Sequence, residues 1–139
     1  LLYGGSSASE TERIDESEAV MVARFGDWKR VMGSLSEEQL VRCTDPEGNT
    51  LLHIAASSNN LEVLEKLLSI PRIRVDAVDK QGHTALGFAA ANGHVDSVSR
   101  LLFAGADPNK KDVHGHSPIW AAKDRGHENV LGLFLKSAT

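Results

Sequence analysis

Apolar residues recur three and four positions apart in several segments of the chain, the spacing typical of short amphipathic helices. The clearest segments are LEVLEKLL from Leu61, VDSVSRLL from Val95 and ENVLGLFL from Glu128. Their predicted buried stripe consists of Leu64, Val98 and Leu131 and, one turn later, Leu68, Leu102 and Leu135. A second short apolar segment precedes each of these helices, so the pattern predicts an all-α protein built from helix pairs.

This pattern repeats at a fixed interval. Three segments align without gaps: DPEGNTLLHIAASSNN from Asp45, DKQGHTALGFAAANGH from Asp79 and DVHGHSPIWAAKDRGH from Asp112. Their starts at 45, 79 and 112 are 34 and 33 residues apart. A fourth segment, AVMVARFGDWKRVMGSL from Ala19, lacks the turn residues but keeps both helical patterns. Such a period indicates a repeat protein, in which only stacking can bury the apolar face of each unit.

Each full repeat opens with a turn and a helix start. The turns begin at Asp45, Asp79 and Asp112, and a glycine follows three residues later, as β-turns favour. Two residues after the glycine, a hydroxyl can accept the free N–H groups of a helix start. These hydroxyls belong to Thr50, Thr84 and Ser117. The residues thus predict the order of turn, cap and helix in every full unit.

These residues resemble the ankyrin repeat, whose pattern joins D-x-x-G-x-T-P-L-H-x-A-A-x-x-G-H to a second helix. The resemblance implies an all-α ankyrin-repeat solenoid of stacked helix-turn-helix units with β-turn fingers. Full repeats are expected at 45–78, 79–111 and 112–139, after a degenerate helical pair at 16–44. Segment 1–15 is rich in Ser, Gly and Glu and is predicted to be a flexible N-terminal arm.

The sequence departs from the family pattern at the box histidine and in two loops. The histidine, which bridges neighbouring units, is present only as His53. The other units carry Val20, Gly87 and Trp120 at this position. SEEQLVRC follows Leu35 and SIPRIRVD follows Leu68, and within the first loop Ser36 and Gln39 have capping-box spacing.

Composition and charge exclude several classes of function. The chain has 139 residues, enough for one domain, and its net charge of −4 argues against a nucleic-acid partner. Cys43 is the only cysteine, which excludes an intrachain disulfide and favours an intracellular protein. A run of about 18 apolar residues and a signal peptide are both absent, so no membrane insertion is expected. The chain starts without Met and stops just after an apolar run, so we expect a piece of a longer protein.

His114 and His116 flank a turn glycine, and His83 is the equivalent of His116 in the preceding unit. Zinc needs three or four converging ligands, whereas stacked repeats separate His83 from His116 by about 10 Å, a typical helix-packing distance. We therefore expect no metal site, and interpret these histidines as partner contacts or as solvated turn residues. The chain shows no phosphate loop or nucleophile elbow, so neither catalysis, a cofactor nor a small-molecule substrate is expected.

The family resemblance implies a non-enzymatic module that binds another protein through its finger tips and the concave face of its first helices. The candidate contact residues are Lys80, Gln81, His83, Phe88, Asn92, Val113, His114, His116, Trp120, Asp124 and Arg125. Packing is an equally good interpretation of Trp120. The partner stays open, because ankyrin stacks bind many classes of protein with one scaffold.

Two other functions fit the resemblance. The chain could be the regulatory or targeting domain of a larger enzyme or channel, or a small ankyrin chaperone for a basic ribosomal protein. Separately, Asn109, eight residues after Leu101, resembles the ankyrin asparagines that hydroxylases modify.

Overall fold

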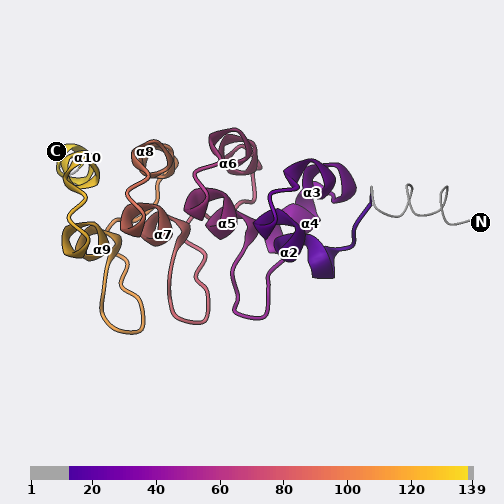
Figure 1. Cartoon of the computed structure of the whole chain (residues 1–139), viewed down its shortest axis with the longest axis horizontal. Coiled ribbons are helices and arrows are strands. Elements are labelled where there is room, and N and C mark those ends of the chain that lie inside the picture. Colours follow the sequence, from indigo (N-terminus) through magenta and orange to yellow (C-terminus); the bar gives the residue numbers. More distant parts are fainter. Residues whose placement is uncertain (1–12, 138–139) are drawn as a thin grey trace, which may run out of the picture.

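The computed structural model describes residues 13–137 as a row of stacked helix pairs with loops projecting to one side (Figure 1). The first helices of the pairs are α2 (Ala19–Arg24), α5 (Leu51–Ser57), α7 (Ala85–Ala91) and α9 (Pro118–Asp124). The second helices are α3 (Trp28–Ser34), α6 (Leu61–Leu68), α8 (Val95–Phe103) and α10 (Glu128–Ser137). The short helix η1 (Glu16–Glu18) precedes the row, and α4 (Glu37–Arg42) follows the first pair. The predicted all-α solenoid of helix pairs is confirmed.

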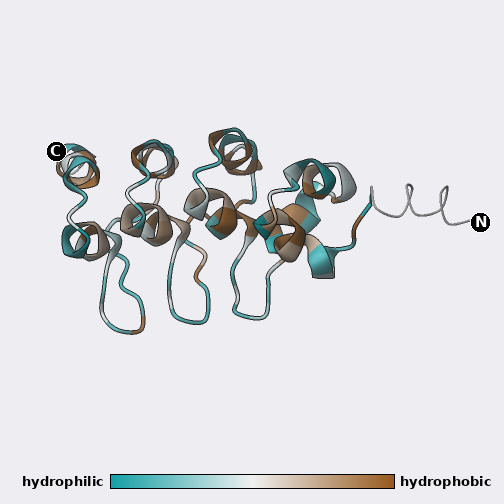
Figure 2. Cartoon of the chain, viewed as in Figure 1, coloured by the Kyte–Doolittle hydropathy of each residue, from teal (hydrophilic) through white to brown (hydrophobic). Residues whose placement is uncertain are grey.

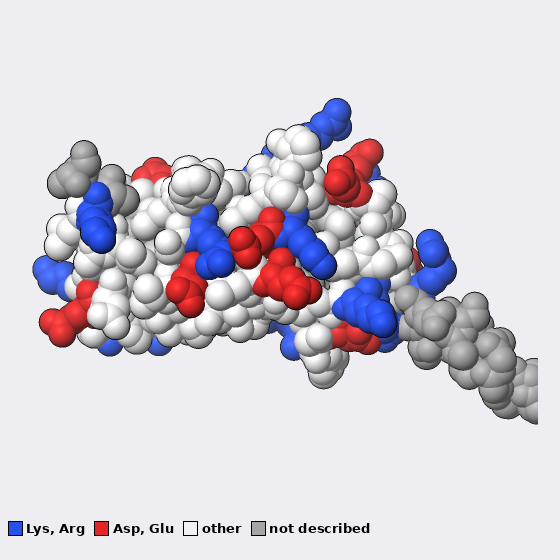
Figure 3. All heavy atoms as spheres, turned by 90° about the horizontal axis from the view of Figure 1, so that it is seen from above, with Lys and Arg blue, Asp and Glu red and all other residues white. Residues whose placement is uncertain are grey.

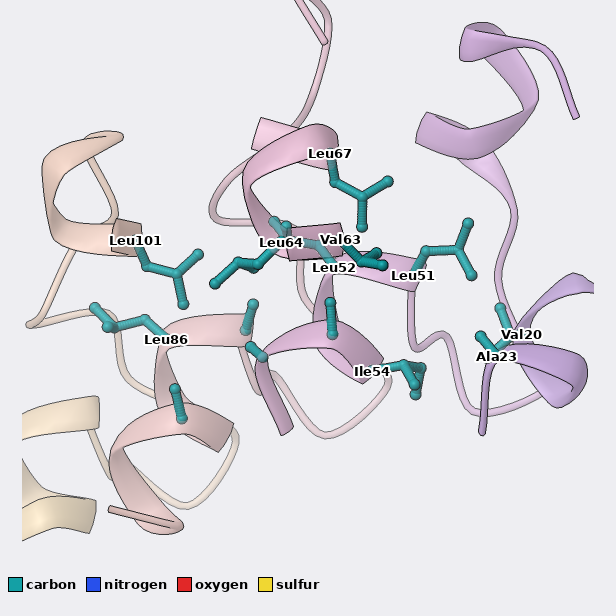
Figure 4. Packing of buried hydrophobic residues seen from close by; sticks show 14 of the residues in the cluster. Val20, Ala23, Leu51, Leu52, Ile54, Val63, Leu64, Leu67, Leu86 and Leu101 are labelled. Atoms are coloured by element: carbon teal, nitrogen blue, oxygen red, sulfur yellow. The ribbon is translucent and has the colours of Figure 1, made fainter. Parts of the chain in front are cut away.

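The apolar core runs along the row between the two layers of helices. Helices of both layers contain apolar residues, brown in Figure 2, and the side chains of buried leucines from the two layers lie between them in Figure 4. Leu51, Leu64, Leu86 and Leu101 are fully buried. Pairs of alanines in α5 and α7 are also fully buried, which lets the first helices of neighbouring units pack closely. Each unit thus buries its apolar face against the next, as stacking requires.

The predicted buried stripe of the second helices is correct at its start and wrong one turn later. Leu64 and Val98 are fully buried, and Leu131 is partly buried. The next buried residues come three positions later instead of four, at Leu67, Leu101 and Phe134. Leu68 and Leu102 lie at the edge of the buried face, and Leu135 is 72% exposed. The residues before the predicted stripe, Val63, Ser97 and Val130, are also buried. The buried face is therefore centred closer to the preceding residue, and the fourth position falls at or beyond its edge.

The loops that project from the row are the three β-turn fingers, here called finger 1 (45–50), finger 2 (79–84) and finger 3 (112–117). In finger 2 the Asp79 Oδ1 accepts the N–H groups of Gln81 and His83, both at 2.9 Å. The aspartates of fingers 1 and 3 accept the equivalent pair of N–H groups. One carboxylate thus holds each turn closed, which confirms the predicted role of these aspartates.

Backbone hydrogen bonds join the fingers to one another. The Lys80 N–H donates to the Glu47 carbonyl at 2.9 Å, and the Val113 N–H donates to the Gln81 carbonyl at 3.0 Å. A Cβ at Gly82, whose φ is +81°, would lie only 3.0 Å from the backbone of finger 3. Glycine is therefore needed at this position both for its conformation and for the close approach.

Helix α4 forms where the sequence has capping-box spacing. The Gln39 N–H donates to Ser36 Oγ at 3.2 Å, and the Ser36 N–H donates to Gln39 Oε1 at 3.0 Å, which confirms the predicted box. Arg42 then forms two 2.8 Å hydrogen bonds to the Glu16 carboxylate, which join α4 to η1.

Most of the predicted N-terminal arm, residues 1–12, lies outside the described residues. At its end Ile14 is buried, and its N–H donates to Ser34 Oγ at 3.1 Å. The limits of the arm and of the individual repeats stay predictions.

Candidate protein-binding groove

The site is organised by one histidine that bridges two repeats. The Thr50 N–H donates to Nδ1 of His53 at 2.9 Å, so Nε2 carries the proton and donates to the His83 carbonyl at 2.8 Å. Burial disfavours the charged ring and lowers the pKa of His53 below its ordinary value. The predicted bridge at His53 is confirmed, and it fixes the base of finger 2 against α5.

The same contact is absent one repeat later, because Gly87 replaces the histidine. A groove of about 520 Å³ opens there between fingers 2 and 3 and helices α7 and α9. Gly87 and Thr84 of one repeat and Pro118 of the next are among the residues that line it.

Most of the sequence-predicted contact residues meet in this groove. Those that line it are His83, Phe88, Asn92, His114, His116, Trp120, Asp124 and Arg125. The others, Lys80, Gln81 and Val113, are exposed near the tips of fingers 2 and 3 and do not line the groove. The finger bases and the first helices therefore form one continuous surface, while the three tip residues stand apart from it.

Two aromatic pairs stand in the groove. The His116 and Trp120 rings are stacked, with centroids 3.5 Å apart and an angle of 4° between their planes. The His83 and Phe88 rings lie 5.3 Å apart. Trp120 remains 42% exposed despite its stacking. It is therefore both packed against finger 3 and available for contact, so the two interpretations of this residue do not exclude each other.

The charges of the groove are mixed. His83 lies between two carboxylates, with Nδ1 3.4 Å from Asp79 Oδ2 and Nε2 3.2 Å from Asp112 Oδ2, so its ring stands between fingers 2 and 3. Burial acts to raise the pKa of Asp112, but hydrogen bonds from the His116 and His114 N–H groups outweigh it and hold that pKa below its ordinary value. Basic Lys110 and Arg125 and acidic Asp124 also line the groove.

Within residues 13–137, no group of three or more histidine, cysteine or acidic side chains is arranged to hold a metal ion. Cys43 is buried, and burial raises the pKa of its thiol to about 11, which keeps it in the unreactive thiol form. None of the described helices is long and apolar enough to span a bilayer.

The remaining histidines between helices connect repeats. His94 Nε2 lies 3.0 Å from the Ser57 carbonyl oxygen, and His127 Nε2 lies 2.9 Å from the Ala91 carbonyl oxygen. Each ring therefore reaches back to the first helix of the preceding unit, a structural role.

Sequence reasoning missed a second set of exposed apolar residues at the other end of the row. Met21 is 56% exposed and Phe25 is 84% exposed. Phe25 stands at the helix-end position that Asn92 and Arg125 occupy in later units. The sequence could have revealed this, because Phe25 is a large apolar residue at a position where later repeats carry polar residues. Asn109 is exposed near the groove, and its hydroxylation stays a prediction.

The chain is similar in sequence to several known proteins. A family model described as "Ankyrin repeats (3 copies)" matches residues 19–112. The inactive serine/threonine-protein kinase TEX14 of Mus musculus is 38% identical over 92 residues, which are 66% of this chain and 6% of that protein. Ankyrin repeat domain-containing protein 63 of Homo sapiens is 31% identical over 121 residues, 85% of this chain and 30% of that protein.

A channel is among the similar proteins as well. The human transient receptor potential cation channel subfamily A member 1 is 31% identical over 102 residues, 71% of this chain and 9% of the channel. The chain therefore spans less than a third of the length of each of these relatives.

Proposed function

Because the chain belongs to the ankyrin-repeat family, we propose that it is a non-enzymatic module that holds another protein in the groove between fingers 2 and 3 and helices α7 and α9. The observation that carries this proposal is the convergence of exposed aromatic, histidine and charged side chains on that groove. The groove is mostly preformed, since aspartate-closed turns and the packed helices α7 and α9 form its walls. A rigid surface of this kind loses little conformational entropy when a partner binds.

Trp120 is the expected anchor of the interaction. Its ring is held in place by the stack on His116 and is 42% exposed. Large aromatic residues fixed in a pocket carry much of the binding energy at protein interfaces. We expect His114, Asp124 and Arg125 to surround this anchor and to select the partner by charge and hydrogen bonding.

Substitution of the anchor tests the proposal. Trp120→Ala should weaken capture of the native partner about thirtyfold, because truncation of a central aromatic anchor costs about 2 kcal/mol or more. Proteins captured from the native cell by the wild-type chain would be identified by mass spectrometry and their affinities measured with purified components.

Phe103→Ala is the matched control, because Phe103 is an even more exposed aromatic, at 97%, on the second-helix layer. The proposal requires that this variant retain full affinity. Equal loss in both variants, or no loss with Trp120→Ala, would refute a role for the groove. A triple alanine variant at Lys80, Gln81 and Val113 then shows whether the finger tips contribute.

A second candidate is that the same groove serves as a regulatory or targeting domain within a larger enzyme or channel. The names of the kinase and channel relatives, and the small share of each that the chain matches, favour this candidate. The molecular mass of the native gene product, measured by immunoblotting, tests it. The mixed charges of the groove give no support to a chaperone of basic proteins, which needs an acidic surface.

A further inference from the structure

The floor of the groove repeats a hydrogen-bonding frame that is filled in the preceding unit. There, the His53 ring joins the Thr50 N–H to the His83 carbonyl, at 2.9 and 2.8 Å. The ring lies inside the stack and is 1% exposed. The frame therefore consists of one donor from a helix cap and one acceptor from the base of the next finger, at a separation that an imidazole spans.

The corresponding groups of the next unit are the Thr84 N–H and the His116 carbonyl, and the local backbone is the same. The Thr84 hydroxyl accepts the Gly87 N–H at 3.0 Å, as the Thr50 hydroxyl accepts the His53 N–H at 3.3 Å. The His116 carbonyl accepts the Asp112 N–H at 2.9 Å, as the His83 carbonyl accepts the Asp79 N–H at 3.1 Å. The frame is thus reproduced without the ring, because Gly87 has no side chain.

The backbone at Gly87 leaves room for the first atom of a side chain. A Cβ placed on Gly87 would meet nothing closer than Thr84 Oγ1 at 3.5 Å and Pro118 Cγ at 4.0 Å. The His53 ring of the first full unit is contacted by the Phe88 ring of the second, with centroids 5.5 Å apart. Ala121 stands at the position of Phe88 one unit later and also lines the groove. A small residue there leaves this slot open toward the groove.

We propose that the slot bounded by Gly87, Thr84, Pro118 and His116 receives an imidazole ring, supplied by a histidine of the bound partner. The Thr84 N–H donates to one ring nitrogen, and the other ring nitrogen donates to the His116 carbonyl, so the partner completes the bridge that the chain itself makes at His53. This inference rests on the proposed function, because the slot opens into the same groove. It adds the identity of one side chain that the partner must present.

Free imidazole is the probe for this slot. The full chain, labelled with ¹⁵N, is titrated with imidazole at about pH 8, above the ordinary histidine pKa of about 6.5, so that the ring is largely neutral. We expect saturable chemical-shift changes at the Thr84 and Gly87 amides. Acetamide, which also carries a donor and an acceptor but lacks the ring, should produce weaker shifts. Stronger shifts with acetamide would overturn the assignment to imidazole.

Two substitutions at Gly87 add a second readout, the melting temperature, which does not depend on the probe. Gly87→His should restore the bridge within the chain, remove the imidazole response and raise the melting temperature above that of Gly87→Ala. The alanine variant is the control, since it gains more helix propensity than histidine would but lacks the ring, so a higher melting temperature for Gly87→His must come from the bridge. An unchanged imidazole response in Gly87→His, or a melting temperature no higher than that of Gly87→Ala, would overturn the slot.

The proposal for the slot and the proposed function of the groove can be refuted separately. Loss of the partner with Trp120→Ala together with no imidazole response leaves the proposed function intact and refutes the slot. An imidazole response, combined with partner binding that neither Trp120→Ala nor Gly87→His weakens, refutes the partner histidine and the groove function together. Weaker partner binding by Gly87→His than by Gly87→Ala supports the proposal.

Discussion

At the scale of single residues, the position of a histidine in the repeat decides whether its ring connects two units or stands exposed. His53, His94 and His127 reach backbone carbonyls of a neighbouring unit. His114 stands exposed on finger 3. The His53 ring is buried in the stacking interface, so its protonation is linked to folding.

The pH dependence of stability is a direct consequence for His53. Its pKa is lower in the folded chain than in the unfolded chain, where it is about 6.5. The stability that this ring contributes is therefore fully present above about pH 6.5 and is lost as the pH falls from there toward the folded pKa. We expect a loss of at most about 1.4 kcal/mol per pH unit in this window, measured by urea denaturation at several pH values.

His53→Gln is the comparison, because glutamine keeps a donor and an acceptor but does not titrate. The variant should be less stable than wild type at neutral pH, and its stability should fall less steeply below about pH 6.5. A wild type and a variant with parallel pH profiles would show that His53 is not the group responsible.

The fold and part of the site followed from residue patterns at this scale. Asp79 and Thr84 have local roles in the turn and the cap, so the sequence around them was sufficient to predict both. The stack of Trp120 on His116 was not predicted, because it depends on side-chain directions set by finger 3. The open slot at Gly87 was missed for a related reason: a missing side chain has consequences only when the neighbouring repeat is in place.

At the scale of elements, the fingers are held both by their own turns and by one another. Gly82 and Gly115 both have φ near +81°. Their surroundings differ, because a Cβ at Gly82 would contact the backbone of finger 3, whereas one at Gly115 would have nothing within 4 Å. The pair separates the conformational role of the turn glycine from its role in packing.

Alanine substitutions at these two positions should therefore differ in effect. Gly115→Ala carries the left-handed backbone strain alone and should cost about 1–2 kcal/mol. Gly82→Ala adds overpacking against finger 3, worth about 1–3 kcal/mol, and should cost clearly more. Equilibrium urea denaturation of both variants measures the difference, and equal costs would mean that the fingers separate readily.

At the scale of the whole molecule, stability comes from contacts between adjacent units. Acidic and basic side chains are interspersed on the second-helix layer (Figure 3). Ion pairs there, such as Lys66 with Glu62 at 3.5 Å and Arg100 with Glu65 at 3.3 Å, join exposed side chains. Exposed pairs of this kind contribute little, so the buried leucines between the layers determine stability.

Hydrogen exchange should reflect this arrangement. Among the described helices, α5 to α8 have helix pairs on both sides, whereas the pair formed by α9 and α10 packs against α7 and α8 at the end of the row. In a stack stabilised by contacts between adjacent units, terminal units open first. We expect amides of α5 to α8 to exchange most slowly and those of α9 and α10 fastest, as measured by mass spectrometry on this chain. Uniform exchange would show instead that the row unfolds as one unit.

The way the fingers close has a consequence for engineering. Each turn is held by an aspartate carboxylate and by backbone atoms, so the two side chains after that aspartate carry no part of the fold. These pairs are Pro46 and Glu47, Lys80 and Gln81, and Val113 and His114, all of them exposed. A library randomised at these positions would retain the scaffold and vary only what it displays.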